Sequence, residues 1–276
     1  MQDDDSFLDY EDYLGIMQKA FEEAEKKKTL DDKIKKEKSR KVGGNSDVRV
    51  KSGIQGLDEL IGGGFKKNSV IVVGGGVGNG KTTFSMQYII NGMLKFRELG
   101  LFISIDEERE PMYENMKSLG WDLEKLEREK KIVFIDYPAH EVDQFFSQEN
   151  TVLGLIESMN IKRVAIDSAA PLALVYEKED ERRTNLLELM GKIRKWNCTT
   201  LITCEDNADA SPKAPATRYG IESVADGFIY LHNILSGNER KRGIEIIKMR
   251  GTPHSQRIVP MLISKGGITV FPKKRF

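Results

Sequence analysis

Short runs of apolar residues recur along the chain after residue 47, and segments with helical periodicity separate them. Six runs fit buried strands: residues 70–73, 101–105, 131–135, 164–166, 201–203 and 228–231. Strands that alternate with helices are typical of βα units, in which helices cover both faces of a parallel sheet. Three more extended segments then follow one another through short turns, at residues 243–249, 257–263 and 267–271. We therefore predict an α/β fold with a mostly parallel sheet and an antiparallel C-terminal edge.

Residues 1–45 have a different pattern. The first twelve residues carry six acids and no base, and residues 19–41 mix ten Lys or Arg with six acids. A short apolar stripe recurs at helical spacing, at Leu14, Met17, Phe21 and Ala24. It is shorter than the three or four heptads of a coiled coil. We predict a charged helical extension and linker over residues 1–45 and a single domain over residues 46–276. The extension is either a solvated helix or a docking segment for a neighbouring subunit or a partner protein.

The composition limits the partners. The 43 basic and 43 acidic residues cancel, so no global positive field draws the chain to nucleic acid or to a membrane. No apolar run approaches the ~18 residues of a membrane span, and the acidic start is the reverse of a secretory signal. Cys198 and Cys204 have neither zinc-site nor Cys-x-x-Cys spacing. We expect a cytoplasmic protein with two reduced core cysteines and no membrane partner.

A phosphate-binding motif follows the first predicted strand of the sheet. It fits G-x-x-x-x-G-K-[ST] and consists of Gly75, Gly76, Val77, Gly78, Asn79, Gly80, Lys81 and Thr82. The glycines let backbone N–H groups converge on a polyphosphate, Lys81 can reach the β and γ oxygens, and the Thr82 hydroxyl can complete a Mg²⁺ shell. The helix predicted from Thr83 to residue 94 adds its N-terminal dipole. The sequence therefore predicts a site for a nucleoside triphosphate with Mg²⁺.

A second predicted strand, residues 163–166, ends in Asp167 and Ser168. Beside a phosphate-binding loop, a carboxylate at this position points toward the water shell of the bound Mg²⁺. Asp167 is thus the expected metal-site partner of Thr82. Ser168 either senses the γ-phosphate or caps the following turn.

A third strand, residues 101–105, runs into the carboxylates Asp106, Glu107 and Glu108. Hydrolysis needs a base or a positioning group within hydrogen-bond reach of the attacking water. One of these carboxylates is the expected base. The alternative is that they are acidic residues before the N-terminus of a helix begun by Pro111, where negative charge is favourable.

Four further motifs appear in order along the chain: residues 52–65 (SGIQGLDELIGGGF), 118–123 (SLGWDL), 219–227 (YGIESVADG) and 248–254 (KMRGTPH). With them the chain resembles the RecA-like P-loop ATPases, and within these the group of KaiC and the archaeal RadA paralogues. The resemblance covers about residues 48–271. It is far more specific than the phosphate-binding motif alone.

The resemblance implies a homo-oligomeric ring, commonly a hexamer, with ATP and Mg²⁺ bound between subunits. In this group two adjacent glutamates follow the strand that corresponds to residues 101–105 here, and the first acts as base. Asp106 and Glu107 occupy these positions, and Asp106 departs from the pattern by being one methylene shorter than Glu. The base is therefore either Asp106 or Glu107. Lys248 and Arg250 match a basic pair that reaches the γ-phosphate of the neighbouring subunit, whereas in isolation they would be read as the solvated rim of a strand.

Three functions fit these observations. The first is an ATP-hydrolysing, ring-forming regulatory or signalling switch, and the second is an accessory ATPase of DNA repair related to the RadA paralogues. The third is a scaffold stabilised by nucleotide, which binds a partner protein through residues 1–45. The charges of residues 205–219 do not favour a DNA-binding loop. Glu222 and Ser223 stand where KaiC clock proteins carry a phosphorylatable pair, so the sequence does not favour a clock-type autokinase cycle.

Overall fold

The computed structural model of this protein describes residues 48–105, 107–138, 145, 148–174, 176, 178–207 and 214–276. The predicted extension over residues 1–45 lies outside the described residues, and so does Asp106. The boundary between the extension and the domain therefore stays a prediction.

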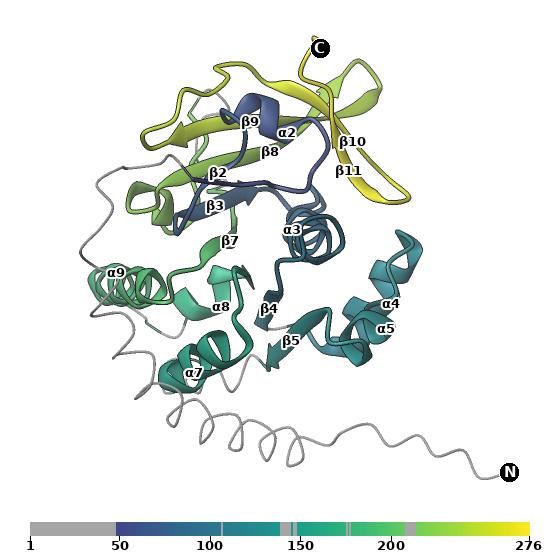
Figure 1. Ribbon diagram of the computed structural model, residues 1–276. Helices are drawn as coiled ribbons and strands as arrows, with labels where there is room; N and C mark the ends of the chain where they lie inside the picture. The colour runs from purple at the N-terminus through teal and green to yellow at the C-terminus, as the bar shows by residue number, and fades with distance from the viewer. Residues whose placement is uncertain are drawn as a thin grey trace, which may run out of the picture.

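A nine-stranded mixed sheet forms the centre of the described domain (Figure 1). Its parallel strands are β3 (Val70–Gly75), β4 (Gly100–Ile105), β5 (Ile132–Tyr137), β6 (Arg163–Asp167), β7 (Thr199–Glu205) and β8 (Gly227–Ser236). The antiparallel strands are β9 (Glu239–Met249), β10 (Val259–Ser264) and β11 (Gly267–Val270). The strand order is β11-β10-β9-β8-β3-β7-β6-β4-β5. The predicted α/β class and the antiparallel C-terminal edge are confirmed.

Helices cover both faces of the sheet, as the buried strands require. One face packs against α2 (Leu57–Leu60), α3 (Lys81–Phe96), α4 (Arg109–Ser118) and α5 (Leu123–Arg128). The other packs against α7 (Glu149–Met159), α8 (Ala169–Leu174), α9 (Glu179–Lys195) and the 3₁₀ turn η2 (Ile221–Ser223). Figure 1 shows α7, α8 and α9 on one side and α3, α4 and α5 on the other. The two-stranded ribbon of β1 (Arg49–Val50) and β2 (Phe65–Lys66) leads into the domain.

Helix α3 is the most central helix of this arrangement, and it begins at the phosphate-binding motif. Residues 84–92 are buried, because α3 contacts both the central strands β4, β6 and β7 and the edge strand β11 of the sheet. The Gln87 amide donates to the Ile268 carbonyl (3.0 Å), and its carbonyl oxygen accepts from the Ile268 N–H (2.6 Å). A polar side chain in this buried position is thus fully paired, and it fixes α3 to the antiparallel edge.

The structure differs from the sequence-based expectation in the lengths of β8 and β9. The apolar run predicted a strand that ended at residue 231, yet β8 continues to Ser236 and β9 begins at Glu239. Residues 232–242 were missed because they form a two-stranded extension whose side chains are largely polar and exposed. Within the part of the chain that the structure describes, no helix combines the length and the apolar character needed to cross a membrane.

Candidate nucleotide-binding site

The phosphate-binding motif forms the turn between β3 and α3, as predicted. Gly75 has φ 151°, and a Cβ there would lie 2.6 Å from the Leu231 carbonyl oxygen. Gly80 has φ 94°, and a Cβ there would lie 2.5 Å from Ile263 Cδ1. Both positions favour glycine through their positive φ, and Gly75 also lacks space for a side chain because the nearby atom belongs to the backbone. The Asn79 amide donates to the Leu231 carbonyl (2.6 Å) and so holds the loop on β8.

Lys81 is the first residue of α3, and its side chain folds back over the loop. Its Nζ donates to the carbonyls of Gly75 (2.8 Å) and Gly76 (3.0 Å). These neutral acceptors are weaker partners for an ammonium group than the charged oxygens of a phosphate. The ammonium group therefore lies beside the loop where a polyphosphate would bind, with partners that a phosphate can replace.

Asp167 ends β6, which is separated from β3 by β7 in the sheet, and its carboxylate meets Thr82 of the phosphate-binding motif. Burial raises the pKa of its carboxyl, while hydrogen bonds from the Thr203 and Thr82 hydroxyls and the charge of Lys81 lower it. The structure thus brings Asp167 to Lys81 and Thr82, from which it lies far apart in the sequence. Ser168 follows Asp167 directly and is half-buried.

The chemistry of these donors fits Mg²⁺. A hydroxyl oxygen and a carboxylate are hard ligands, and Mg²⁺ is usually held by one or two such groups together with phosphates and waters. Within the described residues there is no cluster of three or more His, Cys, Asp or Glu side chains able to hold a metal. A site shared with the nucleotide is therefore the arrangement that these residues favour.

The sequence did not predict Thr203. In β7 it reads as one β-branched residue among others, which is the normal composition of a buried strand. Its hydroxyl nevertheless donates to Asp167 Oδ1, because β7 lies between β3 and β6 in the sheet. The one feature of the sequence that could have indicated this role is the position of Thr203 near the carboxyl end of its strand, where ligands bind in open α/β sheets.

Asp206 is a second residue that the sequence did not predict. The Tyr230 hydroxyl donates to Asp206 Oδ2 (2.9 Å), and a Cβ on Gly76 would lie 3.5 Å from the same oxygen. This carboxylate therefore lies beside the phosphate-binding loop on the face away from α3. Burial, with Asp206, raises the pKa of the Tyr230 hydroxyl.

Glu107 lies at the same edge of the sheet as Asp167, because Ser104 of β4 pairs with Asp167 of β6. The Ser104 hydroxyl donates to the Glu107 carbonyl (2.6 Å), and the Asn115 amide donates to Glu107 Oε1 (3.3 Å). Asp106 lies outside the described residues, so which of the two carboxylates is the base stays open. The helix after them begins at Arg109 rather than at Pro111, since proline is tolerated anywhere in the first turn.

Lys248 and Arg250 lie at the opposite end of the sheet from Lys81. Lys248 pairs with Phe228 at the start of β8, whereas Leu231, further along β8, pairs with Gly75. Lys248 Nζ donates to the carbonyls of Glu222 (3.0 Å) and Ser223 (3.1 Å). Burial, and then the charge of Arg250, lower the pKa of Lys248.

Arg250 lies beside an acidic side chain of its own chain. Its Nη1 is 3.4 Å from Asp226 Oδ1, which also accepts from Arg194 Nη2 at 3.3 Å. The Arg250 side chain is 54% exposed. The structure therefore does not bring this basic pair to the phosphate-binding loop of the same chain, and it leaves the guanidinium accessible.

Comparison with known proteins decides the family. The family model described as "ATPase: KaiC" matches residues 50–275. The chain belongs to the KaiC ATPase family. The resemblance seen in the sequence is thus confirmed, and the RecA-like fold with it.

Two relatives are circadian clock oscillator proteins named KaiC. The protein of Synechococcus elongatus is 33% identical over 233 residues, which are 82% of this chain and 44% of that protein. The protein of Parathermosynechococcus lividus is 34% identical over 232 residues, 81% of this chain and 42% of that protein. This chain therefore spans less than half the length of these relatives.

A solved structure is similar over its full length. The KaiC-like protein of the hyperthermophilic archaeon Pyrococcus horikoshii OT3 is 39% identical, with a TM-score of 0.72. The match covers 82% of this chain and 99% of that one. This KaiC-like neighbour thus supports a single KaiC-like domain here.

Proposed function

We propose that this chain is a Mg²⁺-dependent ATPase whose active sites lie between neighbouring subunits of a ring. The observation that carries the proposal is the convergence of Lys81, Thr82 and Asp167 at the end of β3. Membership of the KaiC ATPase family supports ATP as the nucleotide.

The phosphate-binding loop performs the binding step. Its glycines allow the backbone N–H groups to face the phosphates, and the N-terminus of α3 adds a favourable dipole. Lys81 exchanges the carbonyls of Gly75 and Gly76 for the β- and γ-phosphate oxygens. This exchange replaces neutral acceptors by charged ones, and charge-assisted hydrogen bonds are stronger.

Thr82 and Asp167 are the residues that would hold Mg²⁺. When bound, Mg²⁺ neutralises charge on the β and γ phosphates as the transferred phosphoryl group departs. Asp167 has to be ionised for this role. Its buried position opposes ionisation, and the hydroxyls of Thr203 and Thr82 together with Lys81 favour it.

Asp106 or Glu107 takes the proton of the attacking water. Both follow β4, whose carboxyl end lies beside that of β6. Asn115 holds one oxygen of Glu107 from the next helix. A carboxylate that acts as base has to lie within hydrogen-bond reach of the water.

Lys248 and Arg250 act on the nucleotide of the neighbouring subunit. Their distance from Lys81 within one chain and the exposure of Arg250 support this role. In a head-to-tail ring, one end of the sheet of each subunit faces the opposite end of the sheet of the next subunit. The ring closes when the rotations that relate successive subunits add up to a full turn. We propose a hexamer of this kind in the cytoplasm. Relatives that carry the name of clock oscillator proteins support a regulatory or signalling role.

The test compares wild type with Lys81→Ala in two assays, equilibrium binding of Mg²⁺-ATP and steady-state hydrolysis. Removing one charge-assisted contact should weaken binding by about 10- to 100-fold and abolish most turnover. Lys195→Ala, which removes an exposed lysine at the end of α9, should behave as wild type. Wild-type affinity and rate in Lys81→Ala would remove the basis of the proposal.

A second arm repeats the hydrolysis assay with single-stranded DNA, alongside the native mass. A ring whose rate of ATP hydrolysis does not change when DNA is added fits the regulatory role. Strong stimulation by DNA would instead favour an accessory ATPase of DNA repair.

A further inference from the structure

Strands β8 and β9 extend beyond the rest of the sheet. Strand β8 pairs with β3 only as far as Leu231, and β9 pairs with β10 only at Ile244 and Gly243. Four more residue pairs, from Asn233 with Arg242 to Ser236 with Glu239, join only these two strands to each other. We call residues 232–242 the β8–β9 arm.

The arm carries a concentration of positive charge. Its β9 strand contains Arg240, Lys241 and Arg242, and all three side chains are exposed. Lys241 lies opposite Ile234 and shares its face of the arm, whereas Arg240 and Arg242 lie on the other face because side chains alternate along a strand. The residues after β11 fold back beside it, because a Cβ on Gly243 would lie 2.6 Å from the Phe276 ring. These returning residues include Lys273, Lys274 and Arg275, which are also exposed.

None of these six cations, nor the exposed Arg257, forms an ion pair within the part of the chain that the structure describes. The acids near them in β9 are Glu239, at the start of the strand, and Glu245, which lies 2.7 Å from His232 Nε2. The mutual repulsion of these positive charges favours the binding of an anionic partner.

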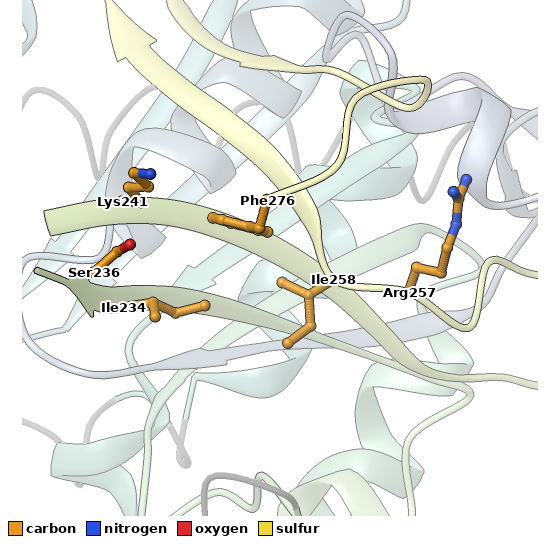
Figure 2. Close-up of a pocket in the computed structure, with 6 residues that line it drawn as sticks. All are labelled: Ile234, Ser236, Lys241, Arg257, Ile258 and Phe276. Carbon is orange, nitrogen blue, oxygen red and sulfur yellow. The ribbon is translucent and has the colours of Figure 1, made fainter.

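The floor between the arm and the returning residues is apolar. An open groove of about 480 Å³ is lined by Ile234, Ser236, Lys241, Arg257, Ile258 and Phe276. Figure 2 shows the three apolar side chains gathered between β8 and the chain end, with Lys241 and Arg257 toward opposite ends of the row. Phe276, in this groove, is 50% exposed. We call this surface the arm groove.

Apolar side chains between lysines and arginines fit a peptide that alternates carboxylates with bulky apolar residues. A phosphate backbone would satisfy the cations but would leave Ile234 and Ile258 uncovered. Burial of such side chains is the main source of affinity at protein interfaces, and charge complementarity adds specificity.

The chain itself contains a segment with this chemistry. Residues 3–14 hold six carboxylates, no basic side chain, and the apolar or aromatic residues Phe7, Leu8, Tyr10, Tyr13 and Leu14. We propose that residues 3–14 dock in the arm groove, of the same chain or of a neighbouring subunit. This inference does not depend on the proposed ATPase activity.

The length of the chain permits this docking. The described residues begin close to the opposite end of β9, where Arg49 Nη1 donates to Thr252 Oγ1 at 2.6 Å. The eleven residues of β9 span about 36 Å at ~3.3 Å per residue. The 33 residues from 15 to 47 can span up to about 110 Å when extended. Residues 3–14 can therefore reach the arm groove of their own subunit or of the next.

The experiment uses the full chain with the photo-crosslinking amino acid p-benzoylphenylalanine in place of Phe7. After irradiation, the crosslinked peptides are identified by mass spectrometry. We expect the crosslinks to map to residues 234–241, to Ile258 or to Phe276. A mixture of unlabelled and ¹⁵N-labelled protein separates crosslinks within one chain from those between subunits.

Charge reversal supplies the matched comparison. Reversal of the two cations that line the arm groove, by Lys241→Glu and Arg257→Glu, should lower the crosslink yield about tenfold, since their ion pairs with the docked carboxylates are replaced by repulsion. Reversal of two exposed cations of α5, by Lys125→Glu and Arg128→Glu, should leave the yield unchanged. Loss of yield in both variants would mean a response to net charge and would overturn the proposal.

Two further outcomes would also overturn it. One is a set of crosslinks that avoids the arm groove in the wild-type background. The other is a reversal of the groove cations that abolishes binding of a labelled 20-nucleotide single-stranded DNA while the Phe7 crosslinks persist. That result would make the arm a nucleic-acid surface instead.

Discussion

The ion pair between Arg163 and Glu98 offers a sharp test of how the nucleotide site is supported. Arg163 begins β6, the strand that ends in Asp167, and its side chain has no exposure to solvent. Its Nε donates to Glu98 Oε2 at 2.7 Å, and its guanidinium lies over the Tyr88 ring at 4.7 Å. A Cβ on Gly92 of α3 would lie 2.4 Å from Arg163 Cδ. The pair therefore joins β6 to the helix that carries Lys81.

Glu98→Gln keeps the shape of the side chain but leaves the buried guanidinium without its counter-charge. Removing one partner of a fully buried pair costs ~3–5 kcal/mol. Glu98 is 33% exposed, so water screens the pair, and we expect a loss of about 2 kcal/mol in the free energy of unfolding. For a domain of this size that loss corresponds to a fall in Tm of about 4–8 °C.

The assay is urea unfolding without nucleotide, followed by tryptophan fluorescence. The double variant Glu98→Gln/Arg163→Met removes both charges and should recover part of the loss, because no unpaired charge stays buried. Glu114→Gln removes an exposed partner of Lys117 and should leave the midpoint unchanged. A urea midpoint for Glu98→Gln equal to that of wild type would refute the role of Glu98. It would show that the aromatic rings and the carbonyl of Tyr88 are enough to stabilise the buried charge of Arg163.

Two further predictions concern the carboxylates of the site. Because burial raises the pKa of Asp167 in the folded state, its contribution to stability is present at low pH and is lost as pH rises through the folded pKa. Asp167→Asn should therefore raise the Tm of the nucleotide-free protein at pH 7 more than at pH 4.5, while the stabilisation by Mg²⁺-ATP disappears; a larger gain at pH 4.5 would contradict the sign. Asp106→Asn and Glu107→Gln remove the acceptor with little change of shape, and single-turnover hydrolysis should slow by ~10²-fold or more in the variant that lost the base. Unchanged rates in both would assign the carboxylates to the helix terminus.

The sequence predicted the parts of the site that are local in the chain. The glycine pattern of residues 75–82 and the strand that ends in Asp167 each carry their own signal, and the structure places them together. Thr203 belongs to no sequence motif, because its role depends on the order of the strands in the sheet. The position of Lys248 and Arg250 far from Lys81 depends on the antiparallel direction of β9, which a motif does not encode.

The extent of the sheet was predicted less completely. Apolar runs mark only strand segments that a core covers, and residues 232–242 extend past that core. The extension over residues 1–45 and the choice between Asp106 and Glu107 stay predictions.

In the proposed ring, each active site combines the phosphate-binding loop of one subunit with Arg250 of the next. A mixing experiment tests this arrangement, because Lys81→Ala breaks every loop and Arg250→Ala breaks every contact from the neighbour. Each variant alone should be nearly inactive.

In a one-to-one mixed ring, roughly a quarter of the interfaces place an intact loop against an intact arginine, since each has a chance of one half. We expect ATP hydrolysis to return once the subunits have exchanged, and native mass spectrometry of differently tagged variants can verify the exchange. A mixture that has exchanged its subunits and stays as inactive as its two components would show that the active site is not shared in this way.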